Sequence, residues 1–196
     1  MLLPRTLILI GRSGAGKGTQ AVKLIEWLKE QYPDQHTFYV KTGEQFRQLI
    51  AGNTYTGQLT KKLLEESKLL PSFLPVWVWS HLLIENLKGG EHLIFDGTPR
   101  MVAEAVVLDS VMDFYNRGKA TVINLEISRE TALKRLTARG RFDDNSQDSI
   151  NRRLDWFETE VVPVIEYFRR SPLYGVLDID GEQMIEDIHT DIVSHL

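Results

Sequence analysis

The feature that most constrains this chain is a glycine-rich stretch near its start. The stretch is Gly11-Arg12-Ser13-Gly14-Ala15-Gly16-Lys17, which fits the pattern G-x-x-x-x-G-K. An apolar run at 6–10 predicts a buried strand before it, and the apolar spacing from Ala21 onward predicts a helix after it. Such a loop turns its backbone N–H groups and the positive end of the helix dipole toward an anion. The sequence therefore predicts a phosphate-binding loop with Lys17 on the phosphates, rather than a plain glycine turn.

Short apolar strands alternate with helical segments along the rest of the chain. Strands are predicted at 6–10, 37–40, 93–95, 120–127 and 176–179, and after the first helix further helices at 43–51, 55–66, 76–87, 102–116, 129–138, 146–168 and 182–194. Continuous apolar strands separated by helices are typical of a parallel sheet that is covered on both faces. We therefore expect an α/β fold of three layers around a five-stranded parallel sheet.

Three local features refine this expectation. Pro71 and Pro75 should break the chain before the helix at 76–87, and Pro163 should kink the long helix at 146–168. Ser128 is in position to cap the helix that follows it. Helices follow one another without a strand at 42–75, which predicts a small helical insertion in one domain that spans 1–196.

Composition excludes several classes of protein. The chain has 196 residues and no cysteine, which removes disulfides, thiolate zinc sites and thiol nucleophiles. Lys and Arg number 23 against 27 Asp and Glu, and the net charge of −4 disfavours a general nucleic-acid binder. No apolar run approaches the roughly 18 residues of a membrane-spanning helix. We expect a soluble, cytoplasmic protein without a nucleic-acid or membrane partner.

One detail of the loop departs from the general pattern and points to a family. Gly18 follows Lys17 where Ser or Thr is usual, and Thr19 comes next. The loop with Gly18-Thr19-Gln20 resembles the phosphate loop of adenylate kinases and related nucleoside monophosphate kinases. The resemblance implies that ATP is held by Gly11, Ser13, Gly14, Ala15, Gly16, Lys17, Gly18 and Thr19.

Two further motifs resemble those of the same family, in the same order. They are Lys41-Thr42-Gly43-Glu44-x-x-Arg47, similar to Ser-Thr-Gly-Asp-x-x-Arg, and Asp96-Gly97-Thr98-Pro99-Arg100, similar to Asp-Gly-Phe-Pro-Arg. The resemblance implies a nucleoside monophosphate site formed by Thr42, Arg47, Leu70, Gly97, Arg100 and Glu104. A planar guanidinium such as that of Arg100 can hold two phosphate oxygens at once. Mg²⁺ is the implied metal, with Asp96 ordering a water molecule bound to it.

A third set of residues resembles the lid of the family and its surroundings. Arg139-Gly140-Arg141-Phe142-Asp143-Asp144 matches a very short lid at 138–145, with no Cys or His available for a structural zinc. The resemblance implies that Arg135 lies beside the ATP, near the turn at 178–182. It also implies a catalytic group around the transferring phosphoryl, made of Lys17, Arg100, Arg139, Arg141 and Arg153. From spacing alone, Arg135 and Arg139 would also fit a solvated helix face.

The resemblance spans nearly the whole chain and implies a monomeric enzyme that moves the γ-phosphate of Mg·ATP to a nucleoside monophosphate. Such a transfer needs positioning and charge stabilisation rather than a strong base, which agrees with many arginines and five scattered histidines. AMP is the leading acceptor (ATP + AMP = 2 ADP). The family's Gln that reads adenine is Glu104 here, and an ionised carboxylate only accepts hydrogen bonds. GMP, CMP, UMP or a deoxy form therefore stay open as acceptors.

Two readings from other classes stay open as well. A kinase that phosphorylates a hydroxyl would need a general base, and it would leave the motif around Arg100 unexplained. A non-catalytic nucleotide-binding interaction protein could use a patch around Trp77 and Trp79 for a partner. Two aromatic residues two positions apart do not share a helix face, so one of them can be exposed. Packing in the core is the favoured interpretation of these tryptophans.

Overall fold

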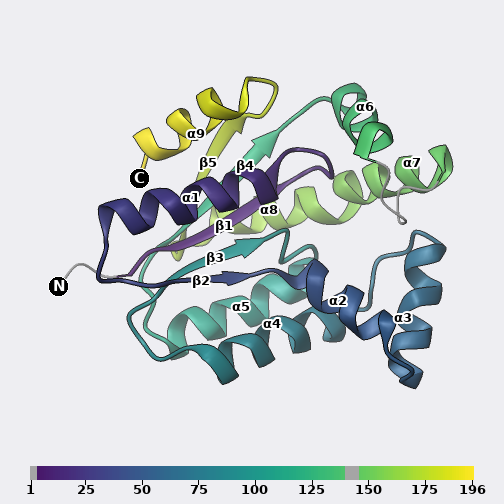
Figure 1. The fold of residues 1–196 in the computed structure, drawn as a ribbon, viewed down its shortest axis with the longest axis horizontal. Helices are drawn as coiled ribbons and strands as arrows, with labels where there is room; N and C mark the ends of the chain where they lie inside the picture. Colours follow the sequence, from purple (N-terminus) through teal and green to yellow (C-terminus); the bar gives the residue numbers. More distant parts are fainter. Residues whose placement is uncertain (1–3, 140–145) are drawn as a thin grey trace.

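A five-stranded parallel sheet forms the centre of the molecule. The computed structural model describes residues 4–139 and 146–196, and its strands lie in the order β2-β3-β1-β4-β5 (Figure 1). Their bounds are β1 Thr6–Gly11, β2 Thr37–Val40, β3 His92–Asp96, β4 Ala120–Glu126 and β5 Tyr174–Asp180. Every neighbouring pair is parallel. The expected fold class is confirmed, with the central strand β1 leading directly into the glycine loop.

Helices cover both faces of the sheet because each strand sends alternate side chains to opposite sides. In β1, Leu7 and Leu9 pack with α1 (Lys17–Gln31) and α9 (Ile185–Ser194). Ile8 and Ile10 pack on the other face. The helices on that face are α4 (Phe73–Asn86), α5 (Val102–Phe114) and α8 (Val162–Arg170). All four β1 residues are at most 2% exposed, so this strand is held from both sides.

Pro71 precedes the helix α4 as predicted, whereas Pro75 acts differently from the prediction. Pro75 does not break the chain before a helix, because α4 begins at Phe73 and includes it. The N–H groups of a first helical turn have no partner within the helix, so a proline there loses no hydrogen bond.

The two tryptophans of α4 lie on different sides of the helix, as their spacing allows. Trp79 is buried, which confirms the predicted core packing for this residue. Trp77 is 56% exposed, so the same prediction is wrong for it.

The long helix predicted at 146–168 is three segments. They are α7 (Gln147–Trp156), a π-helical turn η2 (Phe157–Val161) and α8. Pro163 stands in the first turn of α8, and the wide turn before it takes up the disturbance that we expected as a kink. Ser146 accepts a hydrogen bond from Ser149 N and begins α7 with a capping box. The apolar face therefore continues through the segments although the helix type changes.

The remaining helices begin and end close to their predicted positions. α2 (Thr42–Ala51) and α3 (Tyr55–Glu65) lie at one end of the molecule, apart from the sheet (Figure 1). α6 (Arg129–Arg139) is capped by Ser128, whose Oγ accepts from Thr131 N as predicted. Among the residues that the structure describes, no helix is both long and apolar enough to cross a membrane. The helical insertion at 42–75 and the lid at 138–145 stay predictions, and 140–145 lie outside the described residues.

Candidate active site

The predicted site residues gather at the carboxyl ends of the strands. Gly11 ends β1, Asp96 ends β3, and Gly181 directly follows β5. The chain leaves β1 for β2 on one side, while β4 lies on its other side. In open parallel sheets, a reversal of this kind leaves a crevice beyond the strand ends in which ligands bind. Sheet topology alone therefore places the glycine loop beside the turn after β3.

Two glycines show why the loop needs this residue type. Gly11 has φ 142°, and a Cβ atom there would lie 2.4 Å from the carbonyl oxygen of Leu125 on β4. Gly16 has φ 92° and precedes the first residue of α1, so the chain turns through a left-handed conformation into the helix. Residues with a side chain rarely adopt such a conformation. The backbone therefore approaches β4 closely and then opens the N-terminus of α1 toward the crevice.

Lys17 lies folded over the loop. Its Nζ donates to the carbonyl oxygens of Gly11 and Arg12, both at 2.8 Å. Burial lowers its pKa to about 8, and the positive charges of Arg100, Arg139 and Arg153 act in the same direction, whereas Asp96 opposes them. These arginines come from the turn after β3, from α6 and from α7. The structure therefore brings these three arginines close enough to Lys17 to affect its charge, while their role around a transferring phosphoryl group stays a prediction.

Asp96 is held by a residue that the sequence analysis missed. The hydroxyl of Tyr39 on β2 donates to Asp96 Oδ2 at 2.7 Å. Burial and the neighbouring carboxylate raise the pKa of Tyr39, so its hydroxyl stays a donor. Strand pairing was the available signal, because Tyr39 lies opposite Ile94, two positions before Asp96 on the same face of β3. Gly18 faces this carboxylate, since a Cβ there would lie 3.4 Å from Oδ2.

The surroundings of Asp96 suit Mg²⁺ that arrives with a nucleotide. Over 4–139 and 146–196, no group of three His, Asp or Glu side chains could hold a metal ion. Mg²⁺ keeps several waters and is usually bound through one or two carboxylates and substrate phosphates. Asp96 Oδ1 has no hydrogen-bond partner among the described residues, so it can accept from a metal-bound water. The residues present therefore fit the predicted role of Asp96.

A cavity of about 150 Å³, the acceptor cavity, opens beside the loop. All six residues predicted to bind the monophosphate line it, namely Thr42, Arg47, Leu70, Gly97, Arg100 and Glu104. A smaller cavity of about 40 Å³, the loop cavity, is lined by Gly11, Ser13 and Lys17. Gly97, Arg100 and Arg153 line both. Side chains from three separated motifs therefore form one continuous wall.

Arg100 and Glu104 form a connected unit within this wall. Arg100 Nε donates to the carbonyl oxygen of Gly97 at 2.8 Å, and its backbone N–H donates to Glu104 Oε2 at 3.0 Å. The hydroxyl of Thr98 approaches the same oxygen at 3.5 Å. Burial raises the pKa of Glu104, while the contacts with Arg100 and Thr98 act against that rise. Glu104 is only 2% exposed, so it lies inside the protein rather than pointing to solvent.

The other residues predicted to bind ATP differ in their contacts and in their exposure to solvent. Arg135 donates to the carbonyl oxygens of Gly14, at 3.4 Å, and Gly181, at 3.1 Å, and so joins the loop to the turn after β5. Ala15 is buried beneath the loop, whereas Gly18 and Thr19 are exposed at the start of α1. Arg141 lies outside the described residues, so its role stays a prediction.

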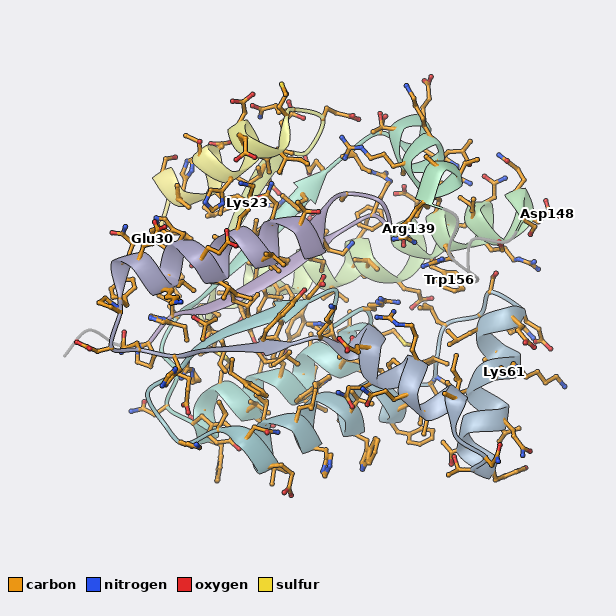
Figure 2. The ribbon with its side chains drawn as sticks, in the orientation of Figure 1. Lys23, Glu30, Lys61, Arg139, Asp148 and Trp156 are labelled. Atoms are coloured by element: carbon orange, nitrogen blue, oxygen red, sulfur yellow. The ribbon has the colours of Figure 1, made fainter. Side chains whose placement is uncertain are left out.

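Two further residues at this site were not identified from the sequence. Arg12 donates to the carbonyl oxygen of Ile127 at 2.7 Å, pairs with Glu158, and lies over the ring of Phe157. It stands at a variable position of the loop pattern, so the motif carries no signal for it. Trp156 lines both cavities and projects from the end of α7 toward α3, where Figure 2 labels Lys61.

Comparison with known proteins gives one consistent result. The sequence model of a family described as adenylate kinase matches residues 9–172. Adenylate kinase 1 of Synechocystis sp. is 34% identical over 194 residues, which cover 98% of this chain and 97% of that protein. The adenylate kinase of Corynebacterium diphtheriae is 33% identical over 184 residues, with 93% and 94% covered. That of Corynebacterium urealyticum is 30% identical over 182 residues, with 93% of both chains covered.

Proposed function

This chain belongs to the adenylate kinase family, and on that premise we propose that it transfers the γ-phosphoryl group of Mg·ATP to AMP, which yields two molecules of ADP. The observation that most directly supports this reaction is the wall shared by the two cavities. Arg100 and Arg153 line both the acceptor cavity and the loop cavity. Phosphates bound in the two cavities would meet at the same guanidinium groups. Phosphoryl transfer requires this kind of alignment between donor and acceptor.

The donor phosphates occupy the glycine loop in this proposal. Backbone N–H groups at the start of α1 face them, and Lys17 neutralises the β- and γ-phosphates. The two carbonyl contacts of Lys17 Nζ hold the amine at the loop before ATP arrives, so little reorganisation is needed. Arg135, which joins Gly14 to Gly181, lies beside the donor nucleotide.

The acceptor phosphate is held by Arg47 and Arg100. An oxygen of AMP is already anionic, so it attacks the γ-phosphorus without a general base. Negative charge on the transferring group is stabilised by Arg139 and Arg153, with Arg141 added by resemblance to the family. The bond between Gly97 O and Arg100 Nε fixes the direction of that guanidinium in advance. Preorganised positive charge of this kind lowers the barrier more than a flexible side chain does.

The carboxylate of Asp96 is the protein group that would serve Mg²⁺. The family uses Mg·ATP, and the metal would supply charge neutralisation for the donor phosphates. Asp96 would hold a metal-bound water through Oδ1, while the hydroxyl of Tyr39 donates to Oδ2. Tyr39 and Asp96 would therefore act by orienting that water rather than by contacting the phosphates.

The same proposal extends to the coarser properties of the enzyme. The helical segment at 42–75 and the short lid at 138–145 close over the substrates and exclude water. The enzyme works as a cytoplasmic monomer, without zinc, nucleic acid or membrane as a partner. Sedimentation and metal analysis of the purified protein check the monomer and the absence of zinc.

Steady-state turnover tests the function. With Mg·ATP and AMP, we expect ADP to form in a two-to-one ratio to the AMP consumed, and Lys17→Met to slow its formation by about 10³-fold. A bisubstrate analogue that joins two nucleosides through a chain of phosphates should bind far more tightly than either nucleotide. Failure of that analogue to bind, together with no ADP from any nucleoside monophosphate, would favour the hydroxyl kinase or the non-catalytic binding protein.

A further inference from the structure

The acceptor cavity contains a buried carboxylate whose hydrogen-bonding capacity is only half used. Glu104 Oε2 accepts from the backbone N–H of Arg100 and lies near the hydroxyl of Thr98. Over the described residues, Oε1 has no hydrogen-bond partner. Glu104 nevertheless lines the cavity and is 2% exposed. Oε1 is not among the fully enclosed polar atoms of the described residues, and Glu104 belongs to the lining of the cavity, so a ligand bound there can supply a donor to this free acceptor.

The part of the ligand that meets Glu104 follows from charge. A phosphate dianion is repelled by a carboxylate and attracted by the guanidinium groups of Arg47, Arg100 and Arg153, which line the same cavity. The phosphate of a nucleoside monophosphate therefore lies toward these arginines. The base is the part left to face Oε1.

The charge state of Glu104 decides which bases suit it. Four cationic groups from different segments line the cavity with it, namely Arg47 of α2, Lys68 after α3, Arg100 after β3 and Arg153 of α7. Of these, the guanidinium of Arg100 favours the ionised form of Glu104. The backbone N–H of Arg100 acts in the same direction, while burial opposes them and raises the pKa of Glu104. An ionised carboxylate only accepts hydrogen bonds.

The purines differ in what they offer to such a group. Adenine has N–H donors at its 6-amino group, but its N1 carries a lone pair that an acceptor repels. Hypoxanthine and guanine carry a hydrogen at N1, and guanine adds a second donor at the 2-amino group. Building on the phosphoryl transfer proposed above, we infer that the acceptor cavity also takes 6-oxopurine nucleoside monophosphates, GMP and IMP, with Glu104 accepting from N1–H. The enzyme is then a purine monophosphate kinase with AMP as one of several acceptors.

Glu104→Gln is the variant that isolates this role. An amide oxygen can still accept from Arg100 N–H, so the turn that carries Arg100 keeps its support. The amide also presents a donor to the base, which suits adenine N1 and opposes the N1–H of a 6-oxopurine. Glu85→Gln, on the exposed face of α4, makes the same chemical change away from the cavity and serves as the control.

The experiment compares AMP, GMP, IMP and purine riboside monophosphate, which has neither a 6-substituent nor an N1 hydrogen. We expect GMP and IMP to react with Mg·ATP at a kcat/KM within about tenfold of that of AMP, and purine riboside monophosphate to react far more slowly. Glu104→Gln should lower the ratio of GMP to AMP by about 10- to 100-fold, mostly through KM, because charge-assisted hydrogen bonds are exchanged. Glu85→Gln should leave the ratio unchanged.

Calorimetry measures the equilibrium binding of each nucleotide beside its turnover. Recognition of the base can then be detected even where phosphoryl transfer is slow. The inference is overturned if GMP and IMP bind more than 100-fold more weakly than AMP. It is also overturned if Glu104→Gln leaves the ratio unchanged, or if purine riboside monophosphate equals GMP. AMP turnover is scored separately. An enzyme that phosphorylates only GMP and IMP would refute AMP as an acceptor but keep the role of Glu104, whereas one that phosphorylates only AMP would do the reverse.

Discussion

The donor half and the acceptor half of this site are built in different ways. The donor half is mostly backbone, with a glycine loop that presses against Leu125 O and a lysine bound to two carbonyl oxygens. The acceptor half is mostly side chains, which reach one cavity from α2, α5, α7 and the loops between elements. A site formed by main-chain groups requires a particular backbone conformation, which few sequences adopt. A site formed by side chains can change its ligand through a single substitution. We therefore expect substitutions in this enzyme to alter its specificity for the base of the acceptor more easily than its binding of the donor phosphates.

Removing the amine of Lys17 attacks the donor half most directly. Lys17→Met should lower kcat by about 10³-fold, because one preorganised charge on the transferring phosphates is lost. Steady-state kinetics at saturating Mg·ATP and AMP measures it. Lys23→Met, two turns further along α1 and paired with Glu186, should change kcat less than about twofold. A Lys17 variant that kept a tenth of the activity would mean that the backbone of the loop suffices alone.

Exchanging arginine for lysine in the two cavities separates the two halves. Arg47→Lys should lower kcat/KM for AMP by about 100-fold and leave the KM of ATP unchanged, because Arg47 lines the acceptor cavity but not the loop cavity, and a lysine cannot hold two phosphate oxygens in one plane. Arg153→Lys should affect both substrates, because Arg153 lines both cavities. Arg152→Lys, at the exposed neighbouring position, is the control. Equal effects of Arg47→Lys on both nucleotides would contradict the division of the site into halves.

The same division explains how much the sequence predicts. The loop was predictable because the spacing of its glycines is forced by backbone geometry, and Gly11 and Gly16 have positive φ as that geometry demands. The strands followed from short apolar runs. All six acceptor residues could be listed because they belong to motifs of a known family, and they do line one cavity.

What the sequence missed depends on contacts between distant segments. Tyr39 and Asp96 are 57 positions apart, and only the pairing of β2 with β3 brings them together. Arg12 reaches Ile127 and Glu158, more than a hundred positions away. Pro75 was misjudged because a proline disrupts the interior of a helix but not its first turn. The spacing of apolar residues reveals which face of a helix is buried. It does not reveal at which residue the helix begins, and so it cannot show whether a proline lies in the first turn or in the interior.

Tyr39 supports the donor half by holding Asp96, and its removal should have a moderate effect. Tyr39→Phe deletes the hydroxyl that fixes Oδ2, so the carboxylate is less well oriented toward a metal-bound water. We expect the Mg²⁺ concentration that supports half-maximal ATP binding to rise by about three- to tenfold. Calorimetric titration of ATP at stepped Mg²⁺ concentrations measures this without turnover. Tyr32→Phe, which removes only a hydrogen bond from Arg5, is the control, and equal shifts in both variants would refute the connection.

The lowered pKa of Lys17 predicts a dependence on pH that belongs to the donor half alone. The amine loses its charge above pH 8 in the free enzyme, so ATP affinity should fall by up to about tenfold per pH unit from there. The stability of the free enzyme runs the other way. Lys17 binds fewer protons in the folded state than in the unfolded state, so stability should rise between pH 8 and 10.5. Both trends should vanish in Lys17→Met, whereas AMP affinity should show neither.

The smallest effect expected is on the stability of the acceptor half. The pKa of Glu104 is raised by burial, so the folded state binds this proton more tightly than the unfolded chain does, and the resulting contribution to stability is lost as the pH rises through the folded value. Glu104→Gln keeps an acceptor for Arg100 N–H but removes the buried charge. We expect the ligand-free variant to gain about 1 kcal/mol at pH 7, or a rise in Tm of about 2–4 °C, with the gain disappearing below pH 4.5.

Thermal melts across this pH range, with Glu85→Gln as the exposed control, measure the difference. A gain confined to Glu104→Gln would mean that the native carboxylate is less stable in the empty cavity than a neutral amide of the same shape. The presence of a carboxylate at position 104 would then be explained by ligand binding and not by the stability of the fold. Equal Tm values at every pH would instead make Glu104 a structural support for the Arg100 turn, and base choice would have to come from elsewhere in the cavity. The acceptor half would then resemble the donor half, in which the fold and the function require the same residues.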